Sequence, residues 1–426
     1  MIKSRKKRIS ITAVLEQSKN TIQSQAFKEE ARKKPQDFTR DRKMPFVNLV
    51  YFMLNMIKAS TQTCLDRFFK LIGREDVHMS QQAFSEARQK IKWEAIRELF
   101  RMIVDLIYEG HYDTWHGYRL MAIDGTKLQL PDDPKLREEF GALGQNNTAA
   151  TAQGSALYDV LNKTLIDARI VPLEIGEREL AMRHIDRLCR LESFSKECIL
   201  FDRGYASFEM VEAMNGRGIS FLMRVKKGFN KSIDLLAEGD HSITLKKGGH
   251  ADITVRVLKF DLPSGEVETL ITDILDRRMG TQAFKELYFM RWPVETKYDE
   301  IKNKLEVENF SGRTTDAIRQ DFYVTMYMSN VATVAYWEAQ EHVDAERDGK
   351  DNKYEYHVNV NHTIGTLKDR FIEALLEEKP RKRAKLARQI LVLITKHVVP
   401  TRPERSRPRS QSPRNAKFRH NRKSNC

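Results

Sequence analysis

The sequence predicts a mixed α/β protein whose two ends are helical and basic. Short apolar runs of strand length alternate with helical segments between residues 118 and 225, a pattern typical of helices that cover a sheet. Residues 226–274 are rich in β-forming side chains separated by glycine and proline, and apolar residues recur at helical spacing on either side of this region. An apolar fraction of 41% and a length of 426 residues indicate a globular chain of two or three domains.

The net charge of +14 is concentrated at the two ends of the chain. Lys379 to Cys426 holds 16 Lys or Arg residues and one acid, and Met1 to Pro45 holds 13 bases and 5 acids. Phe46 to Glu378, in contrast, carries 44 bases and 53 acids. Basic ends neutralise phosphates and release counterions, so we expect a polyanionic partner. A solubilising tail is the lesser alternative.

The sequence shows no sign of secretion, of a membrane span or of structural zinc. The longest apolar-leaning run, Phe46 to Ile57, contains two asparagines and is shorter than a membrane span. No signal-peptide pattern follows the basic N-terminus. The four cysteines form no Cys-x-x-Cys pair. We therefore expect a reduced, cytoplasmic protein without a membrane partner.

Buried strands are expected where short apolar runs end at polar motifs. Leu120 to Ile123 and Cys198 to Phe201 predict two such strands, which stop at Asp124-Gly-Thr126 and Asp202-Arg-Gly-Tyr205. The remaining core elements are two strands joined by a turn, two helices and a further strand: 152–158, 164–171, 177–191, 208–215 and 219–225.

The helical ends predict separate modules on either side of this core. Residues 46–117 have helical periodicity, with Ser80 as a candidate N-cap, and either DNA binding or a purely structural role suits them. Residues 341–356 are polar and are expected to form a loop. The expected division is a basic arm that orders on DNA, a helical module, an α/β core with a β-rich insertion, a helical region and a basic disordered tail: 1–45, 46–117, 118–340 interrupted by 226–274, 341–399 and 400–426.

Three acidic residues are the candidates for a shared site. Asp124 and Asp202 each follow a buried strand directly, and Glu295 lies on a helix after the insertion. Residues at strand ends are held rigidly and face a cleft. Converging carboxylates repel one another unless cations neutralise them, and Mg²⁺ prefers oxygen ligands and tolerates phosphate. Two such ions about 4 Å apart can activate a water or a 3′-hydroxyl and stabilise the leaving oxygen.

Each motif alone has an ordinary structural explanation. Ile-Asp-Gly and Asp-Arg-Gly are most often turns, because Asp is a good turn initiator. Four neighbouring acids are weaker candidates than the three above: Asp132, Asp133, Asp299 and Glu300.

A fourth pattern surrounds Glu295. Tyr288, Arg291, Glu295 and Lys302 are three, four and seven residues apart, so on a continuous helix they would share one face. Together these side chains offer a phenol, a guanidinium, a carboxylate and an ammonium group. This combination suits a phosphate-rich ligand beside a carboxylate-held metal, although a salt-bridged surface helix would also fit. Because Pro293 interrupts the pattern, we expect a helix to begin near it and the first two residues to come from the preceding turn or helix.

Taken together, the motifs resemble those of bacterial insertion-sequence DDE transposases, in particular the insertion-sequence-four class with its Tyr-Arg-Glu-Lys signature. The residues that carry the resemblance are Ala122-Ile-Asp-Gly-Thr126, Phe201-Asp-Arg-Gly-Tyr205 and Tyr288-x2-Arg291-x3-Glu295-x6-Lys302. Gln82 to Lys90 and Glu306 to Gly312 agree with the same family. The resemblance extends from about Phe38 to Arg319.

The resemblance implies a ribonuclease-H-like catalytic core interrupted by the β-rich insertion. Asp124, Asp202 and Glu295 would hold two Mg²⁺ or Mn²⁺ ions. The residues that would contact the DNA backbone are Tyr288, Arg291, Lys302 and, as a helper, Arg203. The implied reaction is hydrolysis at the ends of the element followed by 3′-hydroxyl attack on target DNA, which is cut-and-paste transposition. The implied partners are the terminal inverted repeats, target DNA and a second copy of the chain in a synaptic complex at the bacterial nucleoid.

Two other functions fit parts of the pattern. A nuclease with the same core would cut DNA without joining it. A DNA-binding repressor descended from a transposase is also conceivable, but such a protein would have no physical need to keep all three acids.

Overall fold

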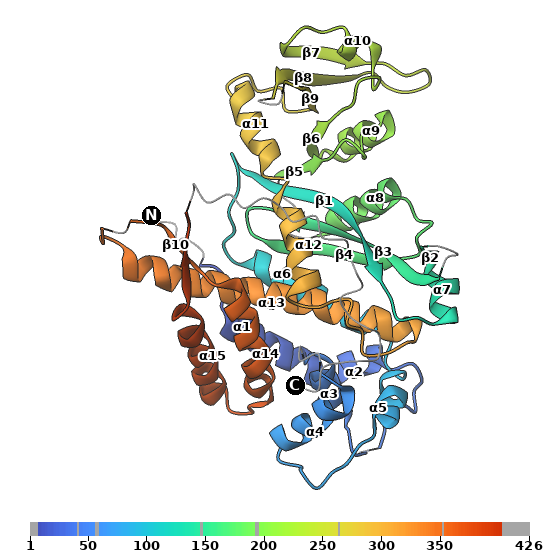
Figure 1. Cartoon of the computed structure of the whole chain (residues 1–426), viewed down its shortest axis with the longest axis vertical. Coiled ribbons are helices and arrows are strands. Elements are labelled where there is room, and N and C mark those ends of the chain that lie inside the picture. Colours follow the sequence, from blue (N-terminus) through green and yellow to red (C-terminus); the bar gives the residue numbers. More distant parts are fainter. Residues whose placement is uncertain are drawn as a thin grey trace. The chain divides into compact units, whose positions relative to one another are not determined.

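Strands and helices alternate through the middle of the chain, and both ends are helical (Figure 1). The computed structural model describes residues 7–40, 42–55, 59–144, 148–191, 196–262, 265–351 and 353–402. The chain divides into two units. Unit 1 comprises Met1–His111, Lys127–Ala152 and Asp299–Cys426, and unit 2 comprises Tyr112–Thr126 and Gln153–Tyr298. The expected mixed α/β architecture with a large mixed sheet is confirmed.

The sheet has nine strands among the described residues, in the order β2-β3-β1-β5-β6-β9-β8-β7, with β4 paired to β3. Strands β1, β5 and β6 run parallel, and β9, β8 and β7 continue the sheet in antiparallel pairing. The strands are β1 (Tyr118–Gln129), β2 (Ala142–Leu143), β3 (Ala149–Asp159), β4 (Thr164–Val171), β5 (Lys196–Phe201), β6 (Ser220–Arg224), β7 (Gly239–Leu245), β8 (Ile253–Asp261) and β9 (Val267–Thr272).

Some helices of unit 2 connect these strands, and others follow the last strand, β9. They are α8 (Glu177–Leu188), α9 (Phe208–Arg217), α10 (Lys231–Asp234), α11 (Thr281–Phe289) and α12 (Pro293–Asn303), the last of which ends in unit 1. The two strands expected to precede the acidic motifs are fully buried between Leu120 and Ile123 and between Cys198 and Phe201. Their continuous apolar character is that of strands covered on both faces.

Helix α13 (Thr315–Arg347) forms the centre of unit 1, and it packs against α1, α6, α14 and α15. Nearly every side chain between Ala317 and Ala335 is buried, as expected for a helix surrounded by others. The other elements of this unit are α1 (Ile11–Gln23), α2 (Gln25–Ala31), α3 (Phe46–Met53), α4 (Thr61–Leu71), α5 (Gln81–Arg88), α6 (Trp93–Glu109), α7 (Pro134–Phe140), α14 (Val360–Leu376), α15 (Pro380–Thr395), β10 (Tyr356–Val358) and β11 (Val398–Pro400). The hydroxyl of Ser80 accepts a hydrogen bond from the N–H of Ala83, so the expected N-cap is confirmed.

Residues 11–31 form helices in unit 1, where Ile11, Val14 and Leu15 are fully buried. The expected arm that orders on DNA stays a prediction. One segment differs from expectation. Residues 341–347 continue α13 rather than forming a loop, because Val343 is buried one turn beyond Ala339. The two units cut across the expected core, so the five-part division stays a prediction. The basic tail beyond residue 402 lies outside the described residues. Within the described part of the chain, no helix combines the length and apolarity that a membrane span requires.

Candidate active site

The pairing of two parallel strands places Asp124 and Asp202 at matching positions. Leu120 on β1 lies opposite Cys198 on β5, and Ala122 lies opposite Leu200. Asp124 lies two residues beyond Ala122, within β1, and Asp202 lies two residues beyond Leu200, directly after the end of β5. Because neighbouring parallel strands present their carboxyl ends at the same edge of a sheet, the two acids belong to one sheet edge.

Strand β1 does not stop at Asp124 as expected, because it continues to Gln129. The glycine that looked like part of a turn lies inside the strand, close to two distant side chains. A Cβ atom on Gly125 would lie 2.8 Å from Nε2 of Gln153 and 2.9 Å from Oε1 of Glu177. A larger residue there would displace the ends of these two flexible side chains.

The Tyr-Arg-Glu-Lys pattern is divided between two helices and a turn. Tyr288 lies on α11, which ends at Phe289, and Arg291 lies in the turn that follows. Helix α12 begins at Pro293, which confirms the expected break, and Glu295 occupies its first turn. The four residues therefore do not form one stripe on a continuous helix.

The guanidinium of Arg291 connects the three acids. Its Nη2 atom lies 3.3 Å from Oε1 of Glu295, and its guanidinium carbon lies 6.0 Å from the ring centroid of Tyr288. The hydroxyl of Tyr288 donates to Oδ1 of Asp202 at 3.4 Å. Burial acts to lower the pKa of Arg291, but the fields of Tyr288, Asp202, Asp124 and Glu295 outweigh it and raise that pKa. All three acids thus lie within electrostatic reach of one buried cation.

Asp124 has an unusual protonation equilibrium. Burial raises the pKa of its carboxyl group to about 6. The N–H of Gly125, 2.9 Å from Oδ1, and the charge of Arg291 oppose that rise, while Glu295 and Glu177 add to it. Burial thus outweighs the stabilisation that the Gly125 N–H and Arg291 give to the ionised carboxylate.

Glu177 is a fourth acid at this site that the sequence did not predict. It is the first residue of α8, and its carboxylate acts on the pKa of Asp124, Tyr205 and Tyr298. It follows no strand and belongs to none of the three motifs. Its one indirect signal is Gly125, since a glycine after a strand-end acid can mark a close approach as well as a turn.

Tyr298 links the helix of the third acid to the strand of the first. Its hydroxyl donates to the main-chain carbonyl of Asp124 at 2.6 Å, and it lies three residues after Glu295 on α12. The same carbonyl accepts a hydrogen bond from Oγ of Ser155 at 3.2 Å. The backbone of Asp124 is therefore fixed both to α12 and to β3.

A buried polar chain stands behind Ser155. Nε2 of His184 lies 3.0 Å from Oγ of Ser155, and Nδ1 of His184 lies 2.8 Å from Oδ2 of Asp167. All three side chains are buried. Burial lowers the pKa of His184, and Asp167 opposes that effect. The network supports the main chain at Asp124 rather than entering the acid cluster itself.

Lys302 and Arg203 are the remaining two predicted residues. Lys302 belongs to unit 1, where its Nζ donates to the carbonyl of Lys127 at 2.6 Å and lies 3.9 Å from Oε1 of Glu308. Arg203 directly follows Asp202 and is exposed in the turn after β5, and no described residue forms a hydrogen bond or ion pair with its side chain. Within unit 2, the described contacts connect Arg291 to Tyr288 and to the fields of all three acids.

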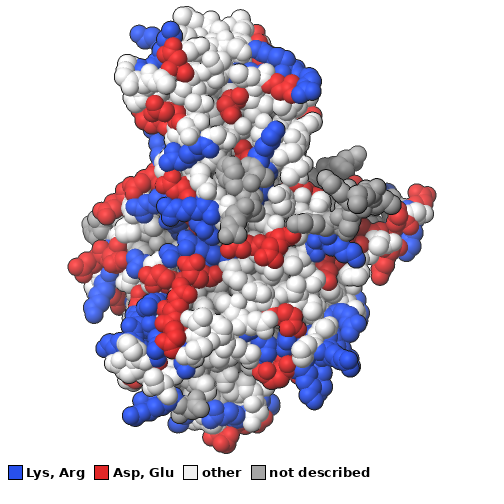
Figure 2. Space-filling view, turned by 180° about the vertical axis from the view of Figure 1, so that it is seen from behind, with Lys and Arg blue, Asp and Glu red and all other residues white. Residues whose placement is uncertain are grey.

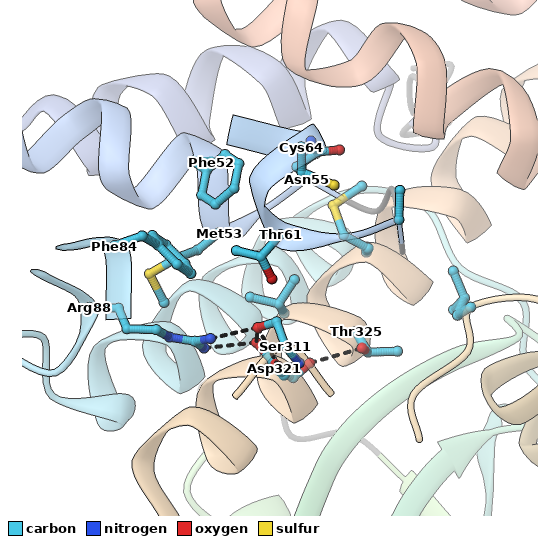
Figure 3. Close-up of a pocket in the computed structure, with 14 residues that line it drawn as sticks. Phe52, Met53, Asn55, Thr61, Cys64, Phe84, Arg88, Ser311, Asp321 and Thr325 are labelled. Carbon is cyan, nitrogen blue, oxygen red and sulfur yellow. Dashed lines mark hydrogen bonds and ion pairs between the residues drawn. The ribbon is translucent and has the colours of Figure 1, made fainter. Parts of the chain in front are cut away.

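The two flanking segments of the resemblance meet in unit 1. Nη1 of Arg88 donates to Oγ of Ser311 at 2.6 Å, and its Nη2 lies 2.7 Å from Oδ1 of Asp321 (Figure 3). The adjoining cavity has a volume of about 50 Å³, room for very few water molecules. Its lining contains none of the predicted site residues, so we assign it a structural role.

Surface charge alone does not mark a site. On the face drawn in Figure 2, basic and acidic side chains are interspersed over the described residues. Among those residues, no three His, Cys, Asp or Glu side chains are grouped closely enough to hold a metal ion.

Comparisons with known proteins identify the family. Residues 115–331, just over half of the chain, match the family model of the transposase DDE domain. The chain is 23% identical over 392 residues to the transposase InsG for insertion sequence element IS4 of Escherichia coli K12, covering 87% of this chain and 86% of that protein. A cryo-EM structure of the piggyBac transposase synaptic complex with hairpin DNA gives a TM-score of 0.46 at 11% identity, with 92% and 88% of the two chains covered, which is too weak a likeness to define the fold. The chain belongs to the transposase DDE domain family.

Proposed function

We propose that this transposase cuts DNA at the ends of its insertion sequence and joins the freed 3′ ends to target DNA. Asp124, Asp202 and Glu295 are the proposed catalytic acids, carried on a ribonuclease-H-like core. The observation that supports this assignment is that Arg291 forms an ion pair with Glu295 and also lies within electrostatic reach of Asp124 and Asp202.

The chemistry of these residues fits divalent metal ions. The three side chains offer only carboxylate oxygens, which Mg²⁺ and Mn²⁺ prefer, and the one guanidinium among them leaves negative charge in excess. When bound, two such ions would supply the Lewis acidity that activates a water or a 3′-hydroxyl. The raised pKa of Asp124 means that a cation there competes with a proton below about pH 6.

The other signature residues orient the acids and the DNA. Burial raises the pKa of Tyr288, so its hydroxyl stays protonated and can donate to Asp202. Arg291 holds Glu295 by an ion pair and can also face a phosphate. Lys302 and Arg203 are proposed to contact the DNA backbone, because both carry positive charge and both stand next to elements that bear the acids.

The proposed partners are the terminal inverted repeats of the element, the target DNA and a second copy of the chain in a synaptic complex. The relative InsG is a transposase for an insertion sequence element, which favours the same class of DNA substrate here. The reaction would take place on DNA in the bacterial cytoplasm.

The test is a cleavage assay on labelled DNA that carries the element's own ends, with Mg²⁺ and with EDTA. We expect Glu295→Ala, Asp124→Ala and Asp202→Ala to lose at least about a hundredfold in cleavage rate while they still bind end DNA. Asp299→Ala is the matched control, because Asp299 is an exposed acid on the same helix as Glu295. Metal-dependent nicking, together with the appearance of joined product, would establish the transposase reaction.

Other outcomes select the alternatives. Nicking without joined product would indicate a nuclease. Binding without cutting by the wild-type protein, under conditions in which it dimerises, would indicate a regulator. Undiminished cleavage by Glu295→Ala would show that another residue is the third catalytic acid.

A further inference from the structure

A cleft in the helical part of unit 1 is lined by more basic than acidic side chains. It lies between the segment that joins α2 to α3 and the stretch from His78 to Lys90, which includes α5, and its volume is about 1010 Å³. That volume is at the upper limit for a small-molecule pocket and suits an open groove. Among the described residues, the charged side chains that line it are Lys28, Arg40, Arg42, Lys43 and Lys90 on the basic side and Asp37 and Glu86 on the acidic side.

Both lining acids have partners other than these cations. Oδ2 of Asp37 accepts a hydrogen bond from the main-chain N–H of Lys34 at 3.0 Å. Oε1 of Glu86 accepts from Nε2 of Gln82 at 3.1 Å. The acids of the cleft are thus engaged locally, and they neutralise its positive charge only in part.

The cations are largely available to a ligand. Among the described residues, no side chain forms an ion pair with Lys28, Arg40, Arg42 or Lys90. Lys43 differs from these four cations, because its Nζ donates to the carbonyl of His78 at 2.9 Å. This hydrogen bond joins the two walls of the cleft.

One wall is held in place by aromatic packing. Phe38 has a φ of 60°, a left-handed conformation that bulky residues rarely adopt. Its ring contacts Phe46 edge-on at 5.3 Å between centroids, and Phe46 also contacts Phe27 at 5.9 Å. The packing of these rings offsets the backbone cost and anchors this wall of the cleft at Phe38.

We propose that this cleft binds the phosphate backbone of double-stranded DNA, as a contact surface that includes none of the signature residues. The inference rests on the proposed function, in which DNA is the substrate. It adds the location of one surface by which the helical part of the chain contacts that DNA. Lysine and arginine side chains that replace counterions bind phosphates with little regard to sequence. The segment between α2 and α3 takes on the DNA-contact role that was expected of a free N-terminal arm.

The test compares two double variants of the full-length chain in binding to a 30-base-pair duplex of arbitrary sequence, measured by fluorescence anisotropy at several KCl concentrations. Arg40→Gln with Arg42→Gln removes two cleft cations. Arg67→Gln with Lys70→Gln removes two exposed cations of α4 that do not line the cleft. We expect the cleft variant to bind on the order of ten- to a hundredfold more weakly near 0.1 M salt, with a log–log salt slope reduced by about two.

The α4 variant is expected to keep the wild-type affinity and salt slope. An equal loss in both variants would show that only net charge matters and would overturn the proposal. A circular dichroism melt of both variants separates loss of binding from loss of folding. If the cleft variant unfolds early, lysine acetylation of the wild type decides instead. DNA must then protect Lys28 and Lys90 and leave Lys70 reactive.

Two further outcomes are informative. If polyglutamate but not DNA protects Lys28 and Lys90 from acetylation, the cleft binds an acidic protein partner and the proposal is refuted. Failure of the wild type to cut DNA, together with loss of binding by the cleft variant, would remove the proposed function and leave the cleft as a DNA site. Cutting by the wild type with an unchanged salt slope in the cleft variant would remove the cleft alone.

Discussion

Two buried arginines in this chain have opposite surroundings. Arg88 in unit 1 forms hydrogen bonds to Gln320, Ser311 and the carbonyl of Ala317 and pairs with one acid, Asp321. One positive charge meets one negative charge, and the polar atoms around them are paired. Such a network stabilises packing between distant segments.

Arg291 in unit 2 is placed among three acids, and its one described ion pair is to Glu295 at 3.3 Å. Burial raises the pKa of Asp124, and Arg291 offsets that rise only in part. The balanced cluster holds two segments together, whereas the unbalanced one has three acids for one buried arginine. That difference distinguishes a structural ion pair from a functional site more clearly than burial does.

The largest expected effect concerns the balanced cluster. Arg88→Ala should lower the free energy of unfolding by about 3–5 kcal/mol, because it leaves Asp321 buried without its partner. Urea denaturation measures the change. The double variant Arg88→Met with Asp321→Leu is the control and should lose less, since no unpaired charge remains. A loss below about 1 kcal/mol in Arg88→Ala would mean that the pair is not structural.

The unbalanced cluster should respond in the opposite direction. The pKa of Asp124 is raised from 3.8 to about 6, so between those values the folded state binds more protons than the unfolded state, and stability falls as pH rises. Asp124→Asn removes this cost. In EDTA at pH 8 the variant should therefore be more stable than wild type by no more than about 3 kcal/mol. Below pH 4 the two should be equal.

Thermal melts across this pH range measure the effect. Asp299→Asn is the control, because it removes an exposed acid and should leave the pH dependence unchanged. Added Mg²⁺ should stabilise wild type and not Asp124→Asn. A variant less stable than wild type at pH 8 would show that Arg291 already neutralises the cluster.

The smallest expected effect concerns the support of the site. Tyr298→Phe removes one hydrogen bond to the carbonyl of Asp124 and should cost about 1 kcal/mol of stability. Because that bond also positions the first acid against α12, cleavage should slow by about tenfold. Tyr327→Phe loses a buried 2.6 Å hydrogen bond to Ser18 in unit 1 and should lose similar stability without slowing cleavage. Equal cleavage rates in the two variants would refute a positioning role for Tyr298.

The sequence predicted best what depends on neighbouring residues. Continuous apolar runs gave β1 and β5 their burial, and Pro293 marked the first residue of α12 because its ring suits a first turn. The aspartates after both runs and the spacing around Glu295 were enough to propose the acids. All of these signals lie within a few residues of the feature they predict.

The contacts made by distant residues could not be predicted. Glu177, Ser155 and Tyr298 come from three different elements, and only the folded chain brings them to Asp124 and Gly125. The same limit explains the end of β1. A glycine after an aspartate indicates a turn locally, whereas here it lies within the strand, where two distant side chains approach it closely.

The parallel register of β1 and β5 makes Asp124 and Asp202 intolerant of changes in chain length. Side chains alternate between the two faces of a strand, so deletion or insertion of a single residue in either strand would turn one acid to the opposite face. The third acid is carried on a helix that follows β7, β8 and β9. Residues can therefore be added or lost in the turns of that hairpin region without disturbing the first pair, and relatives should vary in length there and not within β1 or β5.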